Sequence, residues 1–122
     1  MIVSEALEKV KERKPNPYDD HMLLEWLNEI EAKVQHELLD TPPEGLFTYT
    51  IEEHMEHELL LPKPFDVVYL HYIIAMIEWN QQEYDAYNNT VDLVNLLFED
   101  AKKYYNEKYK GGKVLKVKNW LA

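Results

Sequence analysis

The stretch that decides the fold runs from Phe65 to Lys110 and reads FDVVYLHYIIAMIEWNQQEYDAYNNTVDLVNLLFEDAKKYYNEKYK, without one proline or glycine. A single straight helix of this length would span about 70 Å. A domain of 122 residues has a radius of gyration of only about 14 Å, so the stretch must fold back on itself. Apolar periodicity fades over 80–89, and Asn89 is a suitable N-cap. We therefore expect helices at 64–82 and 89–110, the second ended by Gly111-Gly112.

Two more helices are expected before this stretch. Segment 19–40 carries the strongest amphipathic pattern, with acids such as Glu31 placed on its polar side and Pro42-Pro43 at its end. Segment 4–13 is shorter, with Ser4 as its expected N-cap and Pro15 as its stop. The apolar stripe of the longer helix consists of Leu23, Leu27, Ile30, Val34 and Leu38.

The segment 41–63 has the least regular pattern. Phe47, Tyr49 and Ile51 belong to an aromatic and β-branched run that suits a short strand or an extended loop. The polar run 52–58 that follows suits one or two helical turns or a loop. The sequence thus predicts an all-α domain over 1–110, a compact bundle of about four helices with an irregular loop at 41–63.

The chain continues past Gly111-Gly112 into a C-terminal extension, 111–122, that is expected to be extended. This tail is β-prone but too short to form a stable strand alone. Its apolar side chains need a partner surface, which is either the protein's own body or the sheet edge or groove of a neighbouring molecule. They are Val114, Leu115, Val117, Trp120 and Leu121.

The charge is unevenly distributed along the chain. The net charge is −10, and residues 15–60 contain twelve acids but only one base, Lys33. Residues 101–122 instead contain seven lysines and one acid, Glu107. An acidic body repels a nucleic-acid backbone, so general DNA binding is disfavoured. The basic end either is a solvated helix terminus or meets an acidic surface on another molecule.

Few residues suggest chemistry. The chain has no cysteine, which excludes thiol catalysis and thiolate metal sites, and its one serine is the expected cap. His54 and His57 stand three residues apart among glutamates, a pattern that weakly suggests zinc but matches no established zinc motif. His71 lies within the apolar helix and is more typical of a core histidine than of a ligand. We therefore expect no catalytic residue, cofactor or metal.

Several stretches together resemble a known family. They are KPNPY at 14–18, EWLNEI at 25–30, ELLLPKPFD at 58–66, DAYNN at 85–89 and FEDAKKYY at 98–105. Their order and spacing resemble the small head–tail connector (adaptor, head-completion) proteins of tailed phages and prophages of Gram-positive bacteria. The resemblance covers roughly residues 4–110.

The resemblance implies a mostly helical structural protein without catalytic activity. It would form a ring under the portal protein, extend the DNA channel and dock neck or tail proteins. Such a subunit belongs at the head–tail interface of the virion and in the host cytoplasm during assembly, and it can be monomeric alone. DNA would pass nearby without specific binding, and no membrane is involved.

The interface of such a subunit is expected in two places. The first is the loop, at Phe47, Tyr49 and Ile51, and the second is the tail, at Val114, Leu115, Val117, Trp120 and Leu121. Two alternatives stay open. One is a small metal-binding or enzymatic protein that uses His54 and His57, and the other is a regulatory module whose acidic face mimics DNA.

Overall fold

The computed structural model describes the backbone of residues 1–113 and the side chains of residues 1–108. Within these residues the chain forms helices and no strand; an isolated β-bridge joins Ile2 and Glu58. The all-α prediction is confirmed. In chain order the elements are α1 (Val3–Arg13), α2 (Asp20–Lys33), the π-helical turn η1 (Val34–Leu38), the 3₁₀ turn η2 (Pro43–Gly45), α3 (Ile51–His54), α4 (Val67–Asn80) and α5 (Tyr84–Lys113).

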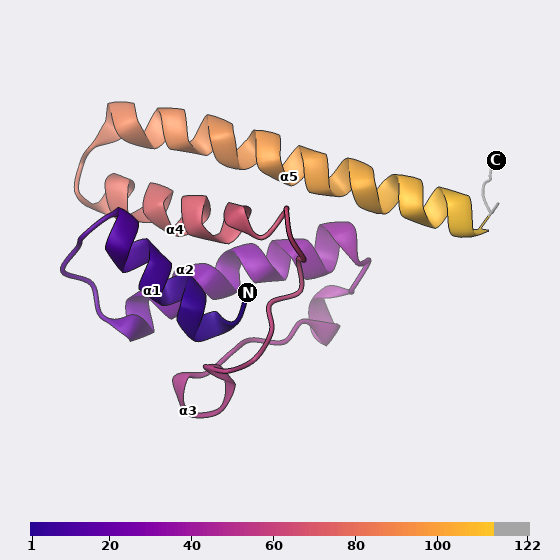
Figure 1. Cartoon of the computed structure of the whole chain (residues 1–122), viewed down its shortest axis with the longest axis horizontal. Coiled ribbons are helices and arrows are strands. Elements are labelled where there is room, and N and C mark those ends of the chain that lie inside the picture. Colours follow the sequence, from indigo (N-terminus) through magenta and orange to yellow (C-terminus); the bar gives the residue numbers. More distant parts are fainter. Residues whose placement is uncertain (114–122) are drawn as a thin grey trace.

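Helix α4 lies at the centre of the bundle. It packs against α1, α2 and α5, and Figure 1 shows α5 running back along α4 as a hairpin. This arrangement explains why α4 is apolar on nearly all sides, with Val68, Leu70, Ile73 and Ile77 all buried. The far end of α5 extends beyond the rest of the bundle (Figure 1).

Helix α1 begins one residue earlier than the sequence suggests. Ser4 is not its N-cap; Ile2 occupies that position and the helix starts at Val3. The free amides of Val3 and Ser4 donate to the carbonyls of His57 and Met55, at 3.0 and 2.8 Å. Carbonyl groups of a loop distant in the sequence thus accept hydrogen bonds from the first amides of α1, where a side-chain cap was expected.

The turn between α4 and α5 is much shorter than predicted. It spans only 81–83, so Asn89 lies inside α5 and is not its cap. Gln82 takes a left-handed conformation at φ 63°. The ring of Trp79 lies 5.1 Å from that of Tyr84 and 5.0 Å from that of Tyr87, between centroids. These contacts between the two helices hold the first turn of α5 in place.

The start of α4 and the end of α5 also differ from the prediction. α4 starts at Val67 and not at Pro64, because residues 63–66 form a turn that contains the cis peptide bond Lys63–Pro64. α5 passes through Gly111 and Gly112 to Lys113. In the part of the chain that the structure describes, no helix combines the length and apolar character needed to cross a membrane.

Candidate functional site: the loop between η1 and α3

The loop contains an extended segment, residues 46–50, which we call the strap. Two side-chain amides hold it, one from α2 and one from η1. Asn28 donates to the carbonyl of Tyr49 at 3.0 Å and accepts from its amide at 2.8 Å. Gln35 pairs with Phe47 in the same two-way manner, with both bonds at 3.0 Å. The two side-chain amides therefore pair with the backbone of the strap in the way that a neighbouring strand does in a sheet.

The π-helical turn η1 supports Gln35, which is 2% exposed. In η1 the amide of Leu39 donates to the carbonyl of Val34 at 3.2 Å, five residues back. The amide of Thr41 then bonds to the carbonyl of Gln35 at 2.9 Å. Because a π turn holds one more residue than an α turn, it shifts the angular position of the residues around it.

Glu31 ties the strap to the rest of the bundle. Its side chain is 1% exposed, so its expected place on the polar side of the helix is wrong. The hydroxyls of Tyr49 and Tyr69 donate to its two carboxylate oxygens at 2.6 and 2.5 Å, and the amide of Leu60 donates at 2.9 Å. The Tyr69 hydroxyl also accepts from the amide of Leu61 at 2.9 Å. One carboxylate thus joins α2 to α4, to the strap and to the segment that follows α3.

This network affects the tyrosines. Burial, together with the adjacent Glu31 carboxylate, raises the pKa of Tyr49 and of Tyr69 well above the usual range. Both phenols therefore stay protonated and keep donating to Glu31 at ordinary pH.

Asn28, Glu31 and Gln35 follow one another at spacings of three and four, so they form a polar stripe on one face of the helix.

The predicted interface residues of the loop differ in exposure. Phe47 is 41% exposed, Ile51 is half-buried, and Tyr49 is only 3% exposed. The rings of Phe47 and Tyr49 are in edge contact at 5.3 Å between centroids. Tyr49 therefore supports this surface from below, while Phe47 faces solvent.

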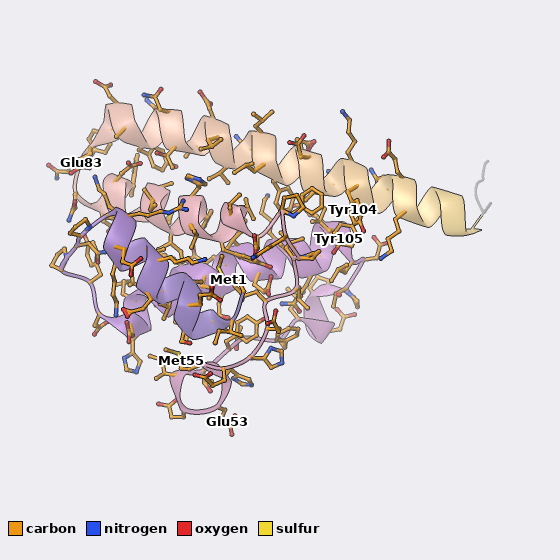
Figure 2. The ribbon with its side chains drawn as sticks, viewed as in Figure 1. Met1, Glu53, Met55, Glu83, Tyr104 and Tyr105 are labelled. Carbon is orange, nitrogen blue, oxygen red and sulfur yellow. The ribbon has the colours of Figure 1, made fainter. Side chains whose placement is uncertain are left out.

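A shallow hollow of about 390 Å³ lies between the strap and the first half of α2. Its walls include Leu24, Thr48 and Ile51, and its charged groups are Glu25 and Glu52. Figure 2 shows Glu53 at the outer turn of α3, pointing away from the body, with Met55 on the side that faces the body. This surface is therefore acidic with a small apolar floor.

His54 and His57 pack against Tyr49, with ring centroids 5.8 and 5.4 Å from it. The amide of Thr50 donates to Nδ1 of His54 at 2.8 Å, so the hydrogen of that ring lies on Nε2. Nδ1 of His57 donates to the carbonyl of Glu58 at 2.8 Å. Among the residues that the structure describes, no group of three or more His, Asp or Glu side chains is placed to hold a metal ion. Both rings pack against Tyr49, and His54 also accepts a hydrogen bond at the N-cap of α3.

A second surface lies on α5. A hollow of about 470 Å³ opens between α2, α4 and α5, with Lys33, Glu37 and Glu99 among its lining residues. On the solvent side of α5, Leu96 is 61% exposed and Leu93 is also exposed. Tyr104 is partly exposed as well, but its ring lies 5.1 Å from that of Phe65, between centroids. The predicted tail residues lie outside the described part of the chain: Val114, Leu115, Val117, Trp120 and Leu121.

Sequence reasoning missed Asn28, Glu31 and Gln35, the residues that build this loop. The available signal was that all three lie on one side of an amphipathic helix, close to its apolar stripe. Polar residues at such a border often bind the backbone of a neighbouring segment. No protein-family model, curated protein or solved structure matches the chain.

Proposed function

We propose that the protein is a structural subunit of a phage particle, a head–tail connector that assembles into a ring below the portal protein. In this role it extends the DNA channel and offers a docking surface to neck or tail proteins. The proposal rests on the resemblance of five sequence stretches to that family. Helix α5 is the structural observation that supports it best.

The solvent side of α5 has the character of a contact surface. Leu96 and Leu93 lie on neighbouring turns and are exposed, whereas Val94 and Phe98 on the other side are buried in the bundle. A helix in a monomer usually exposes polar residues on its outer side, and clustered apolar exposure marks contact sites. The helix also reaches beyond the bundle (Figure 1), so a neighbour can pack against its free end.

The charge distribution supports the same role. A ring is built from head-to-tail contacts between two different patches of one subunit. An acidic body and a basic C-terminal part, with seven lysines in residues 101–122, provide patches of opposite sign. Acidic groups that line a channel also let DNA slide without adhering to it.

Electron microscopy tests the proposal. The full chain is mixed with the portal protein encoded in the same genome, and rings seated on portal particles are expected. Leu96→Glu should abolish these rings while leaving the helical circular-dichroism signal intact, because Leu96 is largely solvated in the free subunit. Asn88→Glu, at another exposed position of α5, is the matched control and should form rings.

Two results would contradict the connector role. One is an absence of portal complexes at any concentration. The other is selective capture of a basic DNA-binding protein, which would favour the acidic regulatory module. Zinc binding in calorimetry that is lost in His54→Gln would favour the metal-binding alternative.

A further inference from the structure

One edge of the strap is only partly paired among the described residues. On this edge the amides of Leu46 and Thr50 donate to the carbonyl of Pro43 and to Nδ1 of His54, and Thr48 lies between them. In an extended chain, the backbone groups of successive residues point to opposite edges. Phe47 and Tyr49 use theirs on Gln35 and Asn28, so the amide and carbonyl of Thr48 point the other way. Within the described residues, Thr48 makes no hydrogen bond, and it is exposed. A further extended segment can add to this open edge through the free amide and carbonyl of Thr48.

The surface next to this edge is acidic and therefore favours a positively charged partner. The hollow beside Thr48 contains Glu25 and Glu52, and its described lining includes His21 but no lysine or arginine. The hollow along α5 has two glutamates as well, but it also has a lysine, Lys33, in its lining. Glu53 and Glu56 add two more exposed carboxylates on the same loop. An extended segment that carries lysines and apolar residues fits this edge better than it fits the other hollow.

The chain itself contains such a segment at its C-terminal end. Residues 113–122 read KVLKVKNWLA, with three lysines, no acid and five apolar side chains of the kind found in strands or interfaces. We propose that this segment of a second copy adds as a strand to the open edge of the strap. Its lysines then lie near Glu25 and Glu52, and its apolar residues cover the floor formed by Leu24 and Ile51.

The position of α5 favours a second copy as the source. The C-terminal end of α5 lies beyond the bundle (Figure 1), so it delivers Lys113 outward. A neighbour placed in line receives it without reversal of the chain. The contact joins two different patches and is therefore heterologous, as a ring requires. It deepens the proposed function and rests on it for its biological setting.

The absence of cysteine from the chain allows a direct test by disulfide trapping. One copy carries Thr48→Cys and a second copy carries Val117→Cys. The two are mixed under mild oxidation, and the disulfide-linked heterodimer is followed on non-reducing gels. It should form at least about tenfold faster than with Asn88→Cys as the partner of Val117→Cys, because docking raises the effective concentration of the thiols.

Charge reversal provides the second arm. Glu25→Lys/Glu52→Lys, combined with Thr48→Cys, should slow heterodimer formation at least about fivefold, because the lysines of the segment are then repelled. Glu8→Lys/Glu12→Lys is the matched control, since both glutamates are exposed on α1 and the net charge is the same. This control should trap as fast as Thr48→Cys alone.

Three outcomes overturn the contact. They are equal trapping of Thr48→Cys and Asn88→Cys, insensitivity to the Glu25 and Glu52 reversal, and an intramolecular disulfide in Thr48→Cys/Val117→Cys without any heterodimer, which assigns the segment to its own body. The outcome is separable from the connector role. Rings on the portal without trapping refute this contact alone, and trapping without rings refutes the connector role alone.

Discussion

Removal of one hydroxyl from the centre of the bundle should destabilise the protein severely. The change is Tyr69→Phe. The Tyr69 hydroxyl donates to Glu31 at 2.5 Å and accepts from the amide of Leu61 at 2.9 Å. Both bonds are buried, so no water is available to replace the lost partner.

The size of the effect follows from these two bonds. A buried amide left without an acceptor costs about 1–3 kcal/mol, and a hydrogen bond to a charged group contributes about 1.5–3 kcal/mol. The two losses are not fully additive, and we expect the free energy of unfolding to fall by about 3 kcal/mol. For a domain of this size the midpoint of thermal unfolding should then drop by roughly 10 °C.

A matched control lies one turn away on the same helix. The hydroxyl of Tyr72 also donates to a glutamate of α2, Glu29, at 2.8 Å, but this bond is exposed. Tyr72→Phe should therefore cost less than about 1 kcal/mol. Urea unfolding followed by circular dichroism measures both variants. Equal losses in the two would refute the conclusion that the Glu31 network is the polar centre of the fold.

Three further predictions concern pH and the faces of α5. The pKa of Tyr69 is raised by burial and the nearby carboxylate, so the free energy of unfolding keeps its full value below about pH 10 and falls as the pH rises above it, which urea titrations across that range will show. Burial and a neighbouring guanidinium lower the pKa of His71. The free energy of unfolding therefore keeps its full value above about pH 6.5 and declines as the pH falls below it. His71→Asn should flatten that decline. Leu96→Ser should change the free energy of unfolding by less than about 0.5 kcal/mol, whereas Val94→Ser, at a position 7% exposed, should cost about 2 kcal/mol; a similar cost for both would mean that the solvent side of α5 packs against the bundle.

The sequence pattern predicted the helices where apolar spacing dominates. The stripe that includes Leu27 and Ile30 gave α2, and the run without proline or glycine gave the α4–α5 hairpin. The predicted start of α5 was wrong. Asn89 has a local preference for the N-cap position, but the contact of Trp79 with Tyr84 fixes where α5 begins. Contacts between helices outweigh local preferences of this size.

The loop could not be predicted in the same way. Periodicity counts apolar residues and treats every polar residue as solvated, so it placed Glu31 outside. The partners of Glu31 are Tyr49, Leu60 and Tyr69, which lie 18 to 38 residues away in the chain. No local pattern identifies which polar residue will meet them. The aromatic run did indicate a short strand or an extended loop at 46–51. Residues 46–50 form such a loop, with extended backbone angles at Leu46 and Thr50, whereas Ile51 begins α3.

The π-helical turn makes the protein sensitive to chain length at one point. His36 and Glu37 lie in this turn and are exposed, so substitutions there should be tolerated. Deletion of a single residue there is a different matter, because each residue of an α-helix adds about 100° of rotation. The turn would close with ordinary spacing, and Gln35 and Leu38 could no longer face the strap and the core together. Insertions and deletions, more than substitutions, should therefore be selected against in this short stretch.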